Sequence, residues 1–182
     1  RKIGGKSVKP YQPDGLWEIN NSTYVPNHGD AVYRRSLYVL IKRSVPNPTL
    51  STFDAPARSY CLARRQKTNT PLQALVTLND PTFVEAAKVM GEQISKANDR
   101  HRAVIEIYRK LTGLTPTTRE LDLLDALQTK ELKKFRDDPS MTKGWLKAGQ
   151  YAVDSHLEPG LVAANAVVAS VILNSDACLT KR

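Results

Sequence analysis

Apolar residues recur every three or four positions over most of the chain after residue 70, a spacing that places them on one face of a helix. The last such segment, residues 160–173, is apolar or small on every face, and a helix of that kind is usually the one on which its neighbours pack. The pattern predicts a helical bundle. Its helices are expected over residues 71–78, 81–97, 100–112, about 117–137, 141–150 and 160–173.

Polar residues mark the starts of these helices. Thr70 can cap the first helix, with Gln73 reaching back in a capping box, and Asp80 can cap the second. Thr117 and Glu120 have the same capping-box spacing. The residues expected to face inward from the second helix are Phe83, Ala87, Met90 and Ile94.

The N-terminal part of the chain lacks this regularity. Prolines, glycines and asparagines interrupt residues 1–30, which are predicted to be extended or loop. A helix is favoured over residues 31–44, with a strand over Ser36–Ile41 as the alternative. A loop over 46–57 and a short helix over 57–66 complete this part.

These elements predict a mainly α-helical fold. We expect a single domain over residues 1–182, in which a helical bundle (71–182) is clasped by a basic, loop-rich segment (1–70), and a chain that is part of a larger protein. The composition, 41% hydrophobic and 25% charged, is that of a soluble globular protein.

The net charge of +9 is concentrated in the loop-rich segment. Residues 1–70 contain 12 Lys and Arg against 4 Asp and Glu, whereas the remaining residues contain 15 against 14. Such a segment suits an acidic neighbouring domain, an acidic polysaccharide or a nucleic acid. A solvated basic surface without a partner is the simpler alternative.

Few residues form a recognisable catalytic or metal-binding pattern. The three histidines are scattered, no nucleophile motif or phosphate-binding loop is present, and we expect no metal and no cofactor in this chain.

Cys61 and Cys178 are interpreted as buried free thiols, with a long-range disulfide as the alternative. Asp80 is interpreted as a helix cap, and Asp54 as a turn residue or a partner for a nearby arginine.

The remaining candidates are two Arg-Arg pairs with polar neighbours. Arginine forks and amides can bind a carboxylate, sulfate or phosphate group. The alternative is an internal role, in which the arginines bind carbonyl oxygens and Asp54 and so hold the loop-rich segment together with the helical part. The candidate anion- or ligand-binding residues are Arg34, Arg35, Arg64, Arg65, Asn69 and Asp54.

A series of motifs along most of the chain resembles a planctomycete-type domain of unknown function. The motifs are Gly4-Gly5, Lys9-Pro10-Tyr11-Gln12-Pro13, Gly15-Leu16-Trp17, Tyr33-Arg34-Arg35-Ser36-Leu37-Tyr38, Phe53-Asp54-Ala55-Pro56, Arg65, Thr68-Asn69-Thr70-Pro71-Leu72-Gln73-Ala74-Leu75, Leu78-Asn79-Asp80-Pro81 and, near the end of the chain, Leu173-Asn174-Ser175. The resemblance implies the C-terminal part of a large extracytoplasmic protein that often carries a c-type cytochrome domain. Any haem c would belong to an upstream domain, because this chain has no CxxCH motif.

Three functions are compatible with this sequence. The first is a non-catalytic module of an exported multidomain protein, which contacts other domains of the same parent protein or binds an acidic glycan or polymer. The second is part of a hydrolase or redox enzyme whose active site is completed by upstream domains. Nucleic-acid binding ranks last, because it rests on charge alone.

Overall fold

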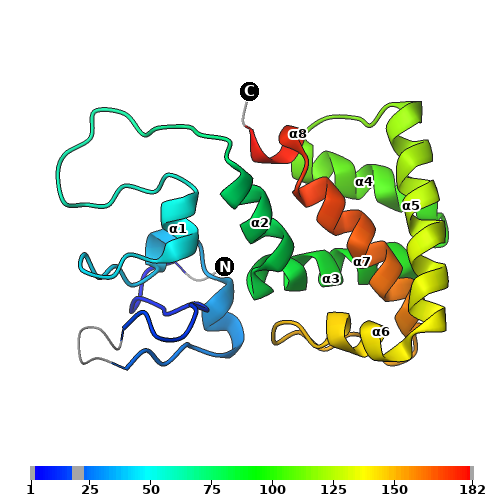
Figure 1. The fold of residues 1–182 in the computed structure, drawn as a ribbon, viewed down its shortest axis with the longest axis horizontal. Helices are drawn as coiled ribbons and strands as arrows, with labels where there is room; N and C mark the ends of the chain where they lie inside the picture. Colours follow the sequence, from blue (N-terminus) through cyan, green and yellow to red (C-terminus); the bar gives the residue numbers. More distant parts are fainter. Residues whose placement is uncertain (1–2, 18–22, 181–182) are drawn as a thin grey trace. The chain divides into compact units, whose positions relative to one another are not determined.

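The computed structural model describes residues 3–17 and 23–180 (Figure 1). Over these residues the regular elements are eight α-helices and short 3₁₀ helices, without a β-strand, so the protein is mainly α-helical as predicted. The chain divides into two compact units, Arg1–Gln73 and Ala74–Arg182. We call them the N-terminal unit and the helical unit and describe each by itself. The expectation of a single domain stays a prediction.

Six helices lie wholly within the helical unit, and one more, α2, crosses the boundary between the units. None of the helices in the described residues is long and apolar enough to cross a membrane. The helices are α2 (Pro71–Asn79), α3 (Pro81–Lys96), α4 (Arg100–Thr112), α5 (Thr118–Asp137), α6 (Pro139–Leu146), α7 (Pro159–Leu173) and α8 (Asp176–Leu179).

The predicted capping residues start these helices. Thr70 and Gln73 form a capping box in which each backbone N–H lies 3.4 Å from the other side-chain oxygen. Asp80 accepts a hydrogen bond of 2.8 Å from an amide in the first turn of α3. Thr117 and Glu120 form the second capping box, and the hydrogen bonds from Thr117 and a tyrosine hydroxyl lower the pKa of the Glu120 carboxyl.

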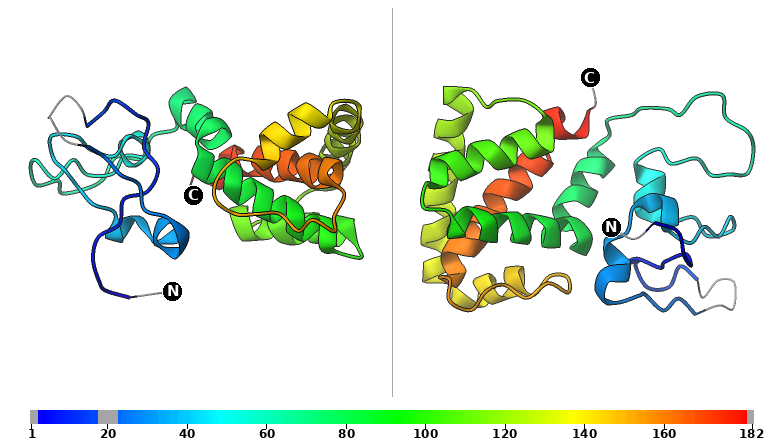
Figure 2. Two further views of the ribbon diagram at one scale, coloured as in Figure 1. Left: turned by 90° about the horizontal axis from the view of Figure 1, so that it is seen from below. Right: turned by 180° about the vertical axis from the view of Figure 1, so that it is seen from behind.

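Helix α7 is the central element of the helical unit, as its uniform apolar pattern predicts. Most of its residues are buried, and it packs against α3, α4, α5 and α6 (Figures 1 and 2). One apolar cluster joins α3, α4, α5 and α7, and a smaller one joins α5 and α7. The members of the first are Ile94, Val104, Ile107, Tyr108, Leu124, Val168 and Ile172, and those of the second are Phe135, Ala163 and Ala164.

In the N-terminal unit the predicted helix over residues 31–44 is wrong. Two short 3₁₀ helices, η2 (Gly29–Tyr33) and η3 (Ser36–Tyr38), are followed by extended chain. The reason is a partner distant in sequence: the Val8 amide donates to the Tyr38 carbonyl and the Leu40 amide to the Val8 carbonyl, both at 2.8 Å. Pairing with residues 3–8, which we call the N-terminal arm, therefore occupies the backbone groups that a helix would have used.

The short helix of this unit lies elsewhere than expected. Helix α1 (Pro48–Thr52) falls in the predicted loop over 46–57, and Asn47 caps it by accepting from the Leu50 amide at 3.0 Å. The predicted helix over 57–66 is wrong, because these residues form bends and irregular chain. Arg58 has a φ of 58°, a left-handed conformation that an α-helix cannot contain.

Helix α6 begins and ends earlier than the predicted 141–150. Asp138 accepts hydrogen bonds from the amides of Ser140 (2.9 Å) and Met141 (3.1 Å), so the helix starts at Pro139. Residues 147–154 form a loop after the end of α6, which we call the anchored loop.

Candidate functional site

Arg34 and Arg35 lie beside Tyr38 in the N-terminal unit. The Arg34 guanidinium donates to the carbonyl oxygens of Lys6 (3.1 Å) and Gly4 (2.6 Å) and stacks 3.7 Å from the centre of the Tyr38 ring. The Gly4 amide donates to the Tyr38 hydroxyl at 3.1 Å, and this hydrogen bond, together with Arg35, lowers the pKa of Tyr38. Arg34 thus ties the N-terminal arm to the segment after η2.

Asp54 and Arg65 close a loop in the same unit. Asp54 accepts hydrogen bonds from the amide (2.8 Å) and hydroxyl (2.9 Å) of Thr68, and Gln73 Nε2 donates to the Thr68 hydroxyl oxygen at 3.0 Å. Arg65 donates from Nε to the Asp54 carbonyl (3.0 Å) and from Nη2 to the Phe53 carbonyl (2.9 Å). We call these contacts the neck, and residues 55–67, between Asp54 and Thr68, the basic loop.

The basic loop extends from α1 to the residues before α2 as a long irregular segment (Figure 1). Every residue from 56 to 67 is exposed. The segment has four cationic side chains and no acidic residue, and two of its apolar side chains are strongly exposed, Tyr60 at 70% and Leu62 at 47%. The neck holds the two ends of this loop together, and exposed loops positioned by a folded scaffold are common carriers of binding function.

The six candidate residues therefore form two groups. Arg34 and Arg35 belong to the group around Tyr38. Asp54, Arg64 and Arg65 lie at the neck or in the basic loop, and Asn69 follows Thr68 of the neck. Arg64 is exposed and has no hydrogen bond or ion pair among residues 3–17 and 23–180. Asn69 is exposed just before α2. Anion binding by these residues stays a prediction.

Replacing Arg65 by alanine is expected to open the neck, whereas replacing the adjacent Arg64 is not. The substitution removes the two hydrogen bonds from Arg65 to carbonyl oxygens. A loss of about 1 kcal/mol raises the equilibrium constant for opening of the neck roughly fivefold. The readout is hydrogen exchange of the Thr68 amide, which donates to Asp54. Equal exchange rates in the two variants would contradict the assignment of Arg65 to the neck.

The two carboxylates that the sequence singled out have structural partners. Asp80 caps α3, and both carboxylate oxygens of Asp54 accept from Thr68. Over the described residues, no group of three His, Cys, Asp or Glu side chains is placed to hold a metal ion.

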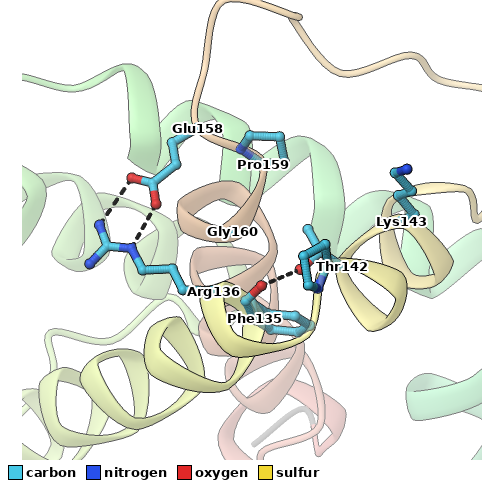
Figure 3. Close-up of a pocket in the computed structure, with 8 residues that line it drawn as sticks. Phe135, Arg136, Thr142, Lys143, Glu158, Pro159 and Gly160 are labelled. Atoms are coloured by element: carbon cyan, nitrogen blue, oxygen red, sulfur yellow. Dashed lines mark hydrogen bonds and ion pairs between the residues drawn. The ribbon is translucent and has the colours of Figure 1, made fainter.

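A cavity of about 250 Å³ lies in the helical unit, where the end of α5, the start of α6 and the start of α7 meet (Figure 3). Arg136 and Glu158 form a bidentate ion pair at its edge, with distances of 2.7 and 3.1 Å. The hydrogen bonds from Arg136 lower the pKa of the Glu158 carboxyl. The two charges compensate each other, and the pair connects the end of α5 to the start of α7.

One face of α3 carries a series of charged residues that the sequence analysis missed. They alternate in sign, and three of the four are buried. The series consists of Glu85, Lys88, Glu92 and Lys96. Lys96, at its exposed end, forms ion pairs with Glu92 (2.6 Å) and with Asp154 of the anchored loop (3.1 Å).

Lys88 is fully buried and holds the chain around the end of α6. Its ammonium donates to the carbonyl oxygens of Leu146 (3.1 Å), Ala148 (2.5 Å) and Tyr151 (2.6 Å). Burial lowers the pKa of Lys88, and the nearby carboxylates, Glu85 first, oppose that shift.

Glu85 binds the same loop through backbone amides of the loop. Its Oε1 atom accepts from the amides of Gln150 (2.9 Å) and Tyr151 (2.5 Å). Gly149 has a φ of 73°, and a Cβ atom there would overlap the Glu85 side chain. The anchored loop is thus fixed by buried charges that bind its backbone, which is a structural role.

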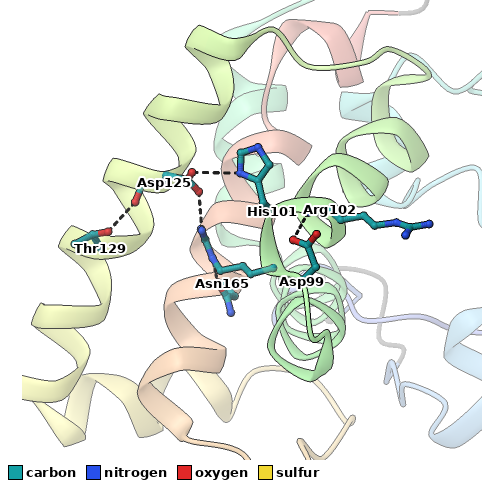
Figure 4. Close-up of polar contacts among 7 residues, drawn as sticks. Asp99, His101, Arg102, Asp125, Thr129 and Asn165 are labelled. Carbon is teal, nitrogen blue, oxygen red and sulfur yellow. Dashed lines mark hydrogen bonds and ion pairs between the residues drawn. The ribbon is translucent and has the colours of Figure 1, made fainter.

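A second polar network runs from the buried Asn165 to the surface of the helical unit (Figure 4). Arg100 pairs with Asp125 at 2.6 Å and donates to the Asn165 side chain at 3.4 Å, and Asn165 donates to the Ser95 hydroxyl at 2.8 Å. The His101 ring lies 3.5 Å from Asp125. These contacts connect α3, α4, α5 and α7 and explain the one amide in the middle of the apolar helix.

Both cysteines are free. Cys61 is exposed in the basic loop, so the expectation that it is buried is wrong. Cys178 is half-buried, and burial raises the pKa of its thiol. The two thiols therefore differ in accessibility.

The motifs around both groups of candidate residues lie within the part of the chain that matches a family model. The model is described as PSD1, protein of unknown function (DUF1553), and it matches residues 1–128. The chain belongs to this family. The match covers the N-terminal unit and continues into α5. No match was found among curated proteins or among solved structures.

Proposed function

We propose that this PSD1 chain is a non-catalytic binding module whose N-terminal unit binds an acidic partner. The observation that carries the proposal is the uneven charge, with 12 cationic against 4 acidic residues in positions 1–70. In the helical unit, pairs such as Arg100–Asp125 and Arg136–Glu158 balance opposite charges. Arg65, by contrast, binds carbonyl oxygens, which carry no formal charge to neutralise it.

The partner we propose is another domain of the same exported parent protein, or an acidic glycan or polymer. This finer part is supported by the resemblance of the sequence motifs and by the charge, which attracts polyanions at long range. A non-catalytic role is supported by the carboxylates of Asp54 and Asp80, which are occupied by hydrogen bonds that shape the fold.

The proposal is tested by measuring the binding of the chain to labelled polyglutamate, to polygalacturonate and, for comparison, to duplex DNA by fluorescence anisotropy. We expect binding of at least one acidic polymer, with an affinity that falls on the order of tenfold between 50 and 200 mM salt, because counterions are released on association. Uncharged dextran serves as the control. Failure to bind either acidic polymer at low salt, or tighter binding of DNA than of both, would overturn the proposal.

A further inference from the structure

The basic loop combines uncompensated positive charge with exposed apolar surface. Its cations are Arg58, Arg64, Arg65 and Lys67. Tyr60 and Leu62 lie among them, 70% and 47% exposed. We propose that this loop is the docking site of the module, and that its occupant is an acidic protein segment with an apolar side chain among its carboxylates. The proposal rests on the proposed function, because it names the site and the partner class for the same binding activity.

The neck gives the loop a defined position for docking. Both ends are held, since Asp54 binds Thr68 and Arg65 binds the carbonyl oxygens of Phe53 and Asp54. Gln73 adds a hydrogen bond to the Thr68 hydroxyl and another to the carbonyl of the last residue of α1. A loop that is already closed loses less conformational entropy on binding than a free segment does.

The side chains of the loop fit carboxylates. Arginine presents a planar fork that binds a carboxylate through two parallel hydrogen bonds. Arg58 and Arg64 are exposed, and neither has a hydrogen bond or ion pair within the described part of the chain. Arg65 is bound at the neck, and Lys67 adds a further exposed charge beside it.

The apolar residues favour a protein segment over a polysaccharide. Tyrosine and arginine are enriched at the centres of protein interfaces. Burial of an exposed leucine against an apolar side chain is favourable, because it removes apolar surface from water. The tryptophans, which would be the best platforms for a sugar ring, are engaged elsewhere. The Lys42 ammonium lies 4.3 Å from the centre of the Trp17 ring, and Trp145 packs against the cluster around Phe135.

The first test locates the site in the unmodified chain. The probe is a short labelled peptide of glutamates with two leucines. Alkylation of Cys61, in the middle of the basic loop, is expected to slow several-fold when the peptide binds, because a docked segment covers the loop. Cys178, half-buried in the helical unit, serves as the internal control. Binding of the peptide without protection of Cys61 would place the site elsewhere.

The second test separates charge from apolar contact. Changing Arg58 to Asn together with Arg64 to Ala should weaken binding of the peptide on the order of tenfold, equivalent to about 1.4 kcal/mol. Asparagine suits the left-handed conformation of residue 58. The control changes Lys130 and Lys133, both exposed on α5, to alanine, which removes the same charge.

Changing Tyr60 and Leu62 to serine should weaken binding of the leucine-containing peptide several-fold and leave binding of an all-glutamate peptide unchanged. If both loop variants bind like the parent chain, the assignment of the docking site to the basic loop is wrong, while the proposed function stands. Binding of polygalacturonate more tightly than the peptide, with no effect of Tyr60 and Leu62, would show that the partner is a glycan. If the parent chain binds no acidic probe, both proposals fail.

Discussion

Replacing Gly91 by alanine is expected to lower the free energy of unfolding of the helical unit by about 3 kcal/mol. A Cβ atom at this position would lie 2.5 Å from the backbone nitrogen and 2.7 Å from the Cα of Ala166. Backbone atoms cannot rotate away, so α3 would have to move from α7. Since α7 is the helix on which α3, α4, α5 and α6 all pack, the shift would disturb the whole core.

A second glycine provides the matched control. Gly144 lies inside α6, and a Cβ atom there would have no atom within 4 Å. Its replacement by alanine is therefore expected to raise the stability by about 0.5–1 kcal/mol, through helix propensity alone. Urea unfolding followed by circular dichroism measures both. If Gly91→Ala behaved like Gly144→Ala, the close approach of α3 and α7 would be wrong.

The sequence predicted those parts of the fold that short-range signals determine. The helix starts at Thr70, Asp80 and Thr117 depend on a residue and its neighbours within one turn, and all three are as predicted. The Asp138-Pro139 pair is the same signal as Asp80-Pro81, and the prediction of residues 141–150 overlooked it. The same holds for Asn47 before Pro48, which starts α1.

The errors occur where a distant segment decides the local structure. Residues 31–44 have helical spacing, but the Val8 amide donates to the Tyr38 carbonyl and the Val8 carbonyl accepts from the Leu40 amide. Nothing in the sequence of residues 31–44 indicates that Val8 pairs with them. Residues 57–66 likewise take their shape from the neck, which joins Asp54 to Thr68 across the basic loop.

The sequence indicated which residue types form the candidate site, but not the role of each residue. Arg64 and Arg65 are neighbours with identical side chains, and only Arg65 is placed to reach the Asp54 carbonyl. In α3 the predicted inward set omitted Lys88 and Glu85, because charged residues are rarely buried without partners. Their partners are backbone atoms of the anchored loop, about 60 positions further along the chain.

Replacing Lys88 by methionine is expected to cost about 3–5 kcal/mol of stability, because Lys88 is a fully buried charge whose partners would be left behind. The change would leave three carbonyl oxygens, those of Leu146, Ala148 and Tyr151, without their donor in a buried place. It would also leave the buried carboxylate of Glu85 without the nearby cation. Methionine has a similar length, so a cavity contributes little to the loss.

Lys147 is the matched control, because it is exposed and is the first residue of the same loop. Lys147→Met is expected to change the stability in urea by less than about 0.5 kcal/mol. Hydrogen exchange then locates the loss: in Lys88→Met the Gln150 and Tyr151 amides should exchange faster, although their acceptor, Glu85, is still present. Faster exchange is expected because only Glu85, which accepts from two backbone amides, would still bind the loop. Unchanged protection of these two amides in Lys88→Met would show that Glu85 by itself fixes the anchored loop and that the buried ammonium is not what holds it.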